Sequence, residues 1–176
     1  VGSGAIGVEF ASFFADMGVQ VTIIEALERI LNAEDEEISA LAHQAFTARG
    51  MAIHTSAKVK KLKSGAKAVE AEVEIGGKIQ TLNADKVIMA VGITGNSEGL
   101  GLEGTKVKLM SGHIETDGMM RTGEPGLYAI GDITGAPWLA HKASHEGIIC
   151  VEAIVGQKDI HAMKADMVPG CTYCRP

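Results

Sequence analysis

The sequence has few cysteines, no excess of positive charge and no long hydrophobic run. Its three cysteines are an odd and small number, which is typical of a reducing compartment and excludes a disulfide-stapled scaffold. Sixteen Lys and Arg against 22 Asp and Glu leave a net charge of −6. This balance argues against a nucleic-acid-binding surface, because such a surface is usually basic.

The longest nearly unbroken apolar run, residues 87–95, is about half the roughly 20 residues that cross a bilayer. The sequence does not begin with a charged segment followed by an apolar one, so no secretory signal is visible. What the sequence does have is ordinary globular composition, with 46% hydrophobic and 22% charged residues. Its 22 glycines favour an α/β protein with tight loops.

Both ends of the chain indicate a piece of a longer protein. It begins Val1-Gly2-Ser3-Gly4, with no Met and without the strand that normally precedes a glycine-rich turn of this kind. The segment 168–176 stops in what resembles the entry to another element. A complete protein with a processed start is the alternative.

Hydrophobic periodicity alternates between helices and strands over the first half of the chain. Apolar spacing predicts helices at residues 5–17 and 35–49, and apolar runs predict strands at 19–25, 51–54 and 85–91. This order is typical of a doubly wound parallel sheet, so the fold class is α/β and Rossmann-like.

An antiparallel excursion interrupts this pattern. Residues 67–75 alternate Val and Ala or Ile with Glu, and Gly76-Gly77 turns the chain back into residues 78–82. After a loop with a domain boundary near Ser97, short strands are expected at 112–115 and 127–130. A final helix is expected to begin near Pro137.

The first chemical motif is Gly2-x-Gly4-x-x-Gly7, followed by a helix and a strand that ends in an acid. Gly2 permits the turn, Gly4 lets the backbone approach a pyrophosphate, and Gly7 lets the helix pack closely. Glu25 lies 18 residues past Gly7, near the spacing of a ribose-binding carboxylate. Such a carboxylate repels a 2′-phosphate, which favours NAD over NADP. Arg29, which could favour NADP, is expected to pair with a surface acid.

Two further acids have less decisive spacing. Glu9 sits among apolar helix residues, and either faces a loop or points along the cofactor toward its nicotinamide end. Asp132 follows Gly131 at the end of an expected strand, where a carboxylate is well placed to hold a chain of sugar-like hydroxyls.

Together, these motifs make the sequence resemble a known family along essentially the whole chain. The segments that carry the resemblance are 2–10, 87–92, 127–132 and the Leu-Ala-His-Lys-Ala-Ser-His-Glu-Gly-Ile run at 139–148. The chain is similar to the pyridine nucleotide-disulfide oxidoreductases, and most similar to the branch that oxidises dihydrolipoamide for 2-oxo acid dehydrogenase complexes. One departure is the Ile-Thr-Gly-Asn that follows Gly92, where the family usually has Arg and Pro.

The resemblance implies the order of the parts. Residues 1–97 would form the NAD-binding domain with its first strand truncated. Residues 98–166 would complete an FAD-binding domain, and residues 167–176 would open a dimerisation domain.

The resemblance also implies roles for particular residues. The glycine loop would hold the NAD pyrophosphate, Glu25 the adenosine ribose and Val59 the adenine. Gly92 would end the strand that lies beneath the cofactor. Asp132, beside Gly131, would hold the ribityl chain of FAD. The full implied set for NAD is Gly2, Ser3, Gly4, Ala5, Ile6, Gly7, Val8, Glu9, Glu25, Val59 and Gly92. For FAD it is Gly131, Asp132, Leu139, Ala140 and His141.

The implied activity of the intact protein is oxidation of dihydrolipoamide by NAD⁺ through a redox disulfide and FAD. The resemblance also implies a homodimer whose partner is the dihydrolipoyl domain of a 2-oxo acid dehydrogenase complex. Other branches (mercuric reductase, NADH oxidase or peroxidase) and a standalone NAD-binding module remain alternatives. The implied location is a bacterial cytoplasm or a mitochondrial matrix. No catalytic residue is expected in this chain, because the family's Cys-x4-Cys pair and His-Glu dyad would lie outside it.

The remaining cysteines and histidines do not favour a metal or thiol site. Cys171-x-x-Cys174 is flanked by Pro and Gly, a context that does not support a redox motif. His141 and His145 are four apart on a helix but lack the glutamate base of metal-binding helices. Cys150 is expected to be a small core residue.

Overall fold

The computed structural model describes residues 1–175 and divides them into two compact units. The first comprises Val1–Gly92 together with the segment from Cys171 onward, and the second is Ile93–Gly170. The break between the units at Gly92 precedes the boundary expected near Ser97. The assignment of residues 1–97, 98–166 and 167–176 to NAD, FAD and dimerisation domains stays a prediction.

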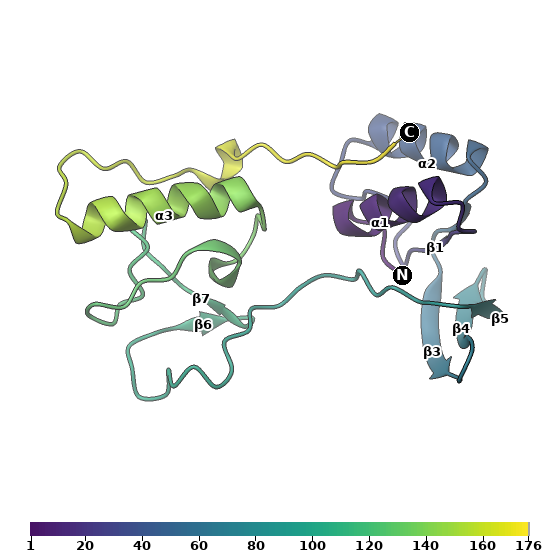
Figure 1. Cartoon of the computed structure of the whole chain (residues 1–176), viewed down its shortest axis with the longest axis horizontal. Coiled ribbons are helices and arrows are strands. Elements are labelled where there is room, and N and C mark those ends of the chain that lie inside the picture. Colours follow the sequence, from purple (N-terminus) through teal and green to yellow (C-terminus); the bar gives the residue numbers. More distant parts are fainter. Residues whose placement is uncertain (176) are drawn as a thin grey trace. The chain divides into compact units, whose positions relative to one another are not determined.

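The first unit begins with the alternation of helix and strand that the sequence predicts. Its elements are α1 (Ala5–Asp16), β1 (Thr22–Ile24), α2 (Glu36–Ala48) and β2 (Ala52–His54) (Figure 1). Strands β1 and β2 are parallel, with Ile23 opposite Ile53. The predicted α/β class with a parallel sheet is therefore confirmed, although β1 is shorter than the apolar run at 19–25.

Local chemistry explains where α2 begins and what it covers. The Asp35 side chain accepts a hydrogen bond from the backbone N–H of Glu37 at 2.8 Å, which caps the helix. On its buried face, Phe46 is fully inaccessible and packs in a cluster with Val8 of α1 and with Ile30. This cluster joins both helices to β1 and so fixes the loop between β1 and α2.

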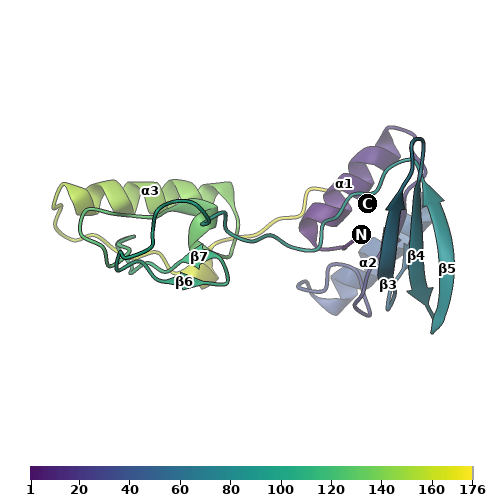
Figure 2. The same cartoon turned by 90° about the horizontal axis from the view of Figure 1, so that it is seen from below.

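A three-stranded antiparallel sheet follows, with the order β3 (Lys58–Ser64), β4 (Val69–Ile75) and β5 (Lys78–Ala84) (Figure 2). The predicted hairpin is confirmed, with Gly76 and Gly77 at positive φ in its turn. The sequence prediction missed β3. Its lysine-rich sequence is largely exposed and shows little alternation, so only pairing with β4 reveals it as a strand.

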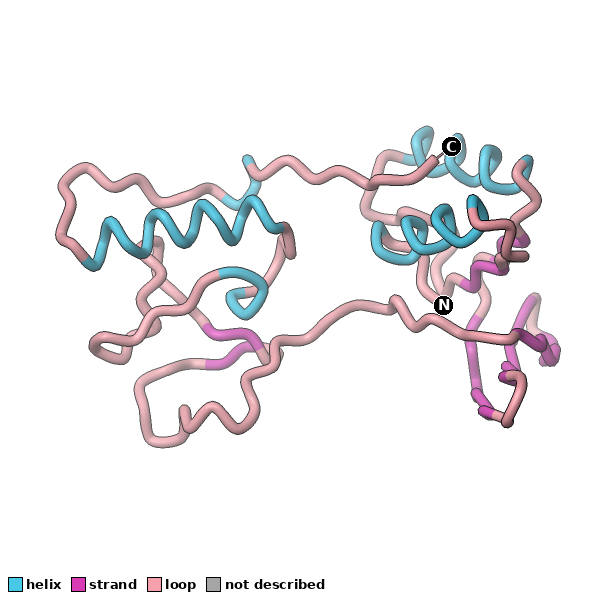
Figure 3. The backbone as a smooth tube through the Cα atoms, in the orientation of Figure 1, coloured by secondary structure: helices cyan, strands magenta, loops and turns pink. Residues whose placement is uncertain are grey.

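Two predicted strands are wrong. Residues 85–91 form no strand, because within residues 1–175 their backbone pairs with Val1 alone. The Val1 amino group donates to the Ile88 carbonyl at 2.8 Å, and the Ala90 N–H donates to the Val1 carbonyl at 2.7 Å. Residues 127–130 form only an isolated bridge between Tyr128 and Arg121. Figure 3 shows how much of the second unit is loop.

The second unit is built around one long helix, α3 (Ala140–Ile154). A short antiparallel pair, β6 (Leu109–Met110) and β7 (His113–Ile114), and the 3₁₀ turns η1 (Gly131–Thr134) and η2 (Ala165–Met167) complete it. Helix α3 begins after Leu139 rather than at the predicted Pro137. Cys150 lies in the core with Ile149 and Met120, which confirms its structural role. Each helix within residues 1–175 falls short of the length or hydrophobicity that a bilayer crossing requires.

Candidate functional site

The glycine loop at the N-terminus of α1 has the geometry that its spacing predicts. Gly2 has φ +90°, and a Cβ there would lie 2.2 Å from the Ala90 carbonyl oxygen. A Cβ at Gly7 would lie 2.1 Å from the Gly2 carbonyl oxygen, so only glycine lets α1 approach the loop. In contrast, Gly4 has nothing within 4 Å of a Cβ position. The loop thus leaves open space at Gly4, where a ligand could approach the helix N-terminus.

Glu25 connects the loop to the end of β1. Its Oε2 accepts hydrogen bonds from the backbone N–H of Ser3 at 2.8 Å and from Ser3 Oγ at 2.6 Å. Its Oε1 accepts one from the Leu27 N–H at 2.8 Å. A carboxylate has about four lone-pair sites, so one site on Oε1 remains for a ribose hydroxyl. The sequence placed Ser3 in the loop but did not reveal that Ser3 anchors Glu25.

The environment of Glu25 keeps it ionised. Only 8% of the residue is exposed, and this burial by itself raises the pKa of a carboxyl group. The hydrogen bonds from Ser3 and Leu27 outweigh burial, and the pKa of Glu25 lies below its ordinary value. At neutral pH the end of β1 therefore carries a fixed negative charge.

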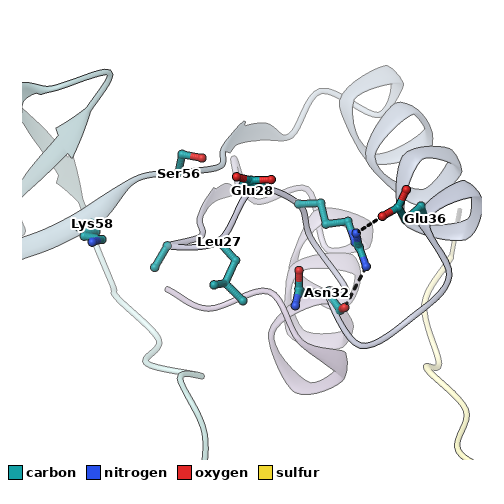
Figure 4. Close-up of a pocket in the computed structure, with 8 residues that line it drawn as sticks. Leu27, Glu28, Asn32, Glu36, Ser56 and Lys58 are labelled. Carbon is teal, nitrogen blue, oxygen red and sulfur yellow. Dashed lines mark hydrogen bonds and ion pairs between the residues drawn. The ribbon is translucent and has the colours of Figure 1, made fainter.

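A cavity of about 790 Å³ opens beside Glu25, on the loop that follows β1. Figure 4 shows Ser56 and Lys58 on one side of it and Glu36 of α2 on the other. The Arg29 guanidinium lines the cavity and forms an ion pair with Glu36 at 2.8 Å, as expected of a surface pair. The cavity is lined by Ala26, Leu27, Glu28, Arg29, Asn32, Glu36, Ser56 and Lys58.

The remaining predicted NAD residues lie around this loop. Ala5, Ile6 and Val8 form the first turns of α1, with Val8 buried in the core and Ile6 half-exposed. Val59 packs partly buried against the cluster of Ile24 and Val73, while its neighbour Lys58 lines the cavity. Gly92 ends the first unit at φ +121°.

Glu9 faces a loop in this structure, which is one of the two readings of its sequence position. Its Oε1 accepts a hydrogen bond from the Tyr173 N–H at 2.7 Å. Two residues further on, the Arg175 N–H donates to Ser12 Oγ at 2.9 Å, so the segment runs along α1. Burial, followed by the Glu9 charge, raises the pKa of Cys174, which opposes thiolate formation.

In the second unit, the Gly-Asp motif forms the start of η1. Gly131 is buried at φ +78°, whereas Asp132 is exposed. Leu139 caps α3 and Ala140 is its first residue, so the peptide N–H groups there are those of a helix N-terminus. His141 Nε2 lies 2.8 Å from the Pro169 carbonyl oxygen. Within this unit, α3 packs against η1, so these five predicted residues share one region.

The sequence prediction missed the residues that hold this motif. Lys142 and Glu146 of α3 form an ion pair at 2.8 Å, with side chains 5% exposed. The signal was available, because opposite charges four residues apart interrupt a stripe of small and apolar residues on α3. For metals, the described residues contain no group of three His, Cys, Asp or Glu side chains that could hold an ion.

Comparison with known proteins identifies the family. The family model described as pyridine nucleotide-disulphide oxidoreductase matches residues 1–147. The chain belongs to this family. Its members use FAD and a pyridine nucleotide, which agrees with the two glycine-containing motifs.

Relatives within this family agree with that assignment over the whole chain. A dihydrolipoyl dehydrogenase of Rhizobium etli is 51% identical and one of Zymomonas mobilis is 45% identical, each over 100% of this chain. The chain spans 37% and 38% of their lengths. The crystal structure of LpdA from Mycobacterium tuberculosis superimposes with a TM-score of 0.87 at 26% identity, over 99% of this chain and 38% of that one.

Proposed function

We propose that this chain supplies the NAD-binding site and part of the FAD-binding site of a dihydrolipoyl dehydrogenase. The observation that carries the NAD site is the Gly2–Gly7 loop, open at Gly4 and joined through Ser3 to the ionised Glu25. The pyrophosphate would lie at the N-terminus of α1, where N–H groups and the helix dipole favour an anion.

Glu25 is the residue that selects NAD. Its Oε1 would accept a hydrogen bond from one ribose hydroxyl. The Ser3 hydroxyl can give up its hydrogen bond to Oε2, which frees Oε2 to accept a hydrogen bond from the second ribose hydroxyl. Within residues 1–175 no ion pair joins Glu25 to a cationic side chain, so its charge repels a 2′-phosphate. The adenosine end of NAD would extend into the cavity between Leu27 and Lys58.

The second unit would hold the flavin. Asp132 is exposed at the start of η1, where its carboxylate can accept hydrogen bonds from the ribityl hydroxyls. The backbone at Leu139, Ala140 and His141 would face the flavin ring. When bound, FAD would supply the transfer of electrons between a dithiol and NAD⁺. The residues of this chain bind and orient both cofactors.

The proposed substrate is dihydrolipoamide, and the proposed partner is the dihydrolipoyl domain of a 2-oxo acid dehydrogenase complex. The names of the Rhizobium etli and Zymomonas mobilis relatives support the substrate. A homodimer in a bacterial cytoplasm fits these bacterial relatives. A mercuric reductase, an NADH oxidase or peroxidase, and a module that only binds NAD are the alternatives.

The test is the protein encoded by the complete reading frame, purified with its flavin. We expect dihydrolipoamide-dependent reduction of NAD⁺, and no turnover from residues 1–176 alone. NADPH-dependent reduction of mercuric ion, or NADH-dependent consumption of oxygen or peroxide without dithiol activity, would contradict the proposal and assign the chain to another branch.

A further inference from the structure

Buried side chains form a hydrogen-bond network with the backbone of the Gly-Asp turn in the second unit. Glu146 Oε2 accepts a hydrogen bond from the Gly131 N–H at 2.6 Å. Lys142 Nζ donates to the Gly131 carbonyl at 3.3 Å and to Thr134 Oγ1 at 3.0 Å. Thr134 Oγ1 in turn donates to the Gly131 carbonyl at 2.8 Å. Both backbone polar groups of Gly131 are thus bound by side chains of one network.

A purely stabilising role explains this arrangement poorly. Desolvating Lys142 and Glu146 costs free energy that their attraction only partly offsets, and apolar residues of similar volume are often equally stable. The pair instead determines one local feature. It holds Gly131 at φ +78°, and this conformation sets the direction in which the chain enters Asp132.

Burial separates the pair from any ligand. The side chains of Lys142 and Glu146 are each 5% exposed, whereas Asp132 is exposed next to the residue that they bind. A change at either residue therefore reaches a ligand at Asp132 only through the backbone of Gly131.

We propose that Lys142 and Glu146 are positioning residues that aim Asp132 at the hydroxylated chain of the flavin. This inference rests on the proposed function, since it assigns FAD to Asp132. The pair acts by preorganisation: because Gly131 is already held, binding does not have to order the turn.

The experiment uses the flavoprotein of the complete reading frame, stripped of FAD and titrated with it. The informative variant is Lys142→Met/Glu146→Met, which removes both charges together and so avoids leaving one buried charge unpaired. We expect its thermal unfolding to stay close to that of the unaltered protein. Its Kd for FAD should rise by about tenfold, because the Gly131 N–H loses its acceptor. The Kd for NADH, bound by the first unit, should not change.

Two single substitutions complete the design. Glu146→Gln keeps the shape and an acceptor oxygen but loses the charge, and should raise the Kd for FAD by about threefold. Because it leaves the Lys142 charge buried without its partner, we expect it to lower stability, so if the double variant does not fold, the FAD affinity of the folded fraction of Glu146→Gln carries the test. Glu152→Gln, a matched change elsewhere on α3, should leave FAD binding unaltered.

The outcomes separate this inference from the proposed function. If the double variant or Glu146→Gln folds and binds FAD within twofold of the unaltered protein, the positioning role is wrong. Loss of stability with unchanged FAD affinity in the folded fraction would show a structural role only, and would also overturn the inference. An unaltered protein that binds no FAD would overturn the flavin assignment itself.

Discussion

Two buried glutamates, one in each unit, hold the backbone of a glycine turn by different electrostatic means. Glu25 accepts hydrogen bonds from Ser3 in the Gly2–Gly7 loop and from Leu27. Glu146 accepts one from Gly131 and is also paired with Lys142 at 2.8 Å. The neutral donors around Glu25 leave its charge available for recognition of a ligand. The lysine beside Glu146 neutralises it, which suits a residue that only supports the turn.

The largest effect should come from leaving one charge of the Lys142–Glu146 pair buried alone. Lys142→Ala should lower the free energy of unfolding of the second unit by about 3–5 kcal/mol, because Glu146 loses its counter-charge. Trp138, the single Trp of the chain, lies in this unit, so its fluorescence during urea unfolding measures the effect. A loss no larger than that of Glu152→Gln, a change of charge elsewhere on α3, would show that the pair is not buried in solution.

A smaller effect is expected in the glycine loop of the first unit. Gly7→Ala should cost about 1–3 kcal/mol, because its Cβ would lie 2.1 Å from the Gly2 carbonyl oxygen. Gly4→Ala is the matched control, since nothing lies within 4 Å of its Cβ. It should change stability by less than about 0.5 kcal/mol but weaken NADH binding. Urea unfolding followed by circular dichroism, with an NADH titration, distinguishes the two. Equal loss of stability in both variants would contradict this geometry.

The charge of Glu25 predicts a pH dependence. Because its pKa in the folded chain lies below the ordinary value of 4.5, ionised Glu25 stabilises the first unit above pH 4.5. That stabilisation should be lost as the pH falls from 4.5 through the lowered pKa. Unfolding of the unaltered chain and of Glu25→Gln should therefore differ at pH 7 and converge in acid. Parallel stability profiles for the two across this range would show that Glu25 is not stabilised as an anion.

A small effect on stability is expected for the Arg29–Glu36 pair, whose side chains are 35% and 83% exposed. Glu36→Gln should change the free energy of unfolding by less than about 1 kcal/mol. It should release Arg29, whose buried Nε has no hydrogen-bond partner in residues 1–175, toward a bound phosphate. Adenosine 2′,5′-bisphosphate should then bind a few-fold tighter while 5′-AMP binds as before, as measured by calorimetry. An unchanged ratio of the two affinities would exclude this role for Glu36.

The sequence predicted the elements whose signals are local. Helices α1 and α2 have apolar spacing and end at glycine, and the β4–β5 hairpin has alternation with a Gly76-Gly77 turn. Predictions failed where the structure depends on partners distant in the chain. Residues 85–91 are as apolar as a buried strand, but among the described residues 1–175 they pair only with Val1. Strand β3 is recognised as a strand because β4 lies beside it.

The same limit applies to the candidate site. The glycine spacing and the distance to Glu25 could be read from the sequence because they belong to one continuous βα unit. The hydrogen bond from the Gly131 N–H to Glu146 joins residues 15 positions apart across a loop. No spacing rule connects a helix glutamate with that turn, so only the packing of α3 on η1 reveals it.

The most direct test of the central claim is a titration of this chain with NADH and with NADPH, followed by nicotinamide fluorescence. The geometry of the Gly2–Gly7 loop and the fixed charge of Glu25 predict one NADH bound per chain. NADPH should bind at least about tenfold more weakly, since its 2′-phosphate meets the Glu25 carboxylate. Absence of NADH binding, or tighter binding of NADPH, would contradict the account.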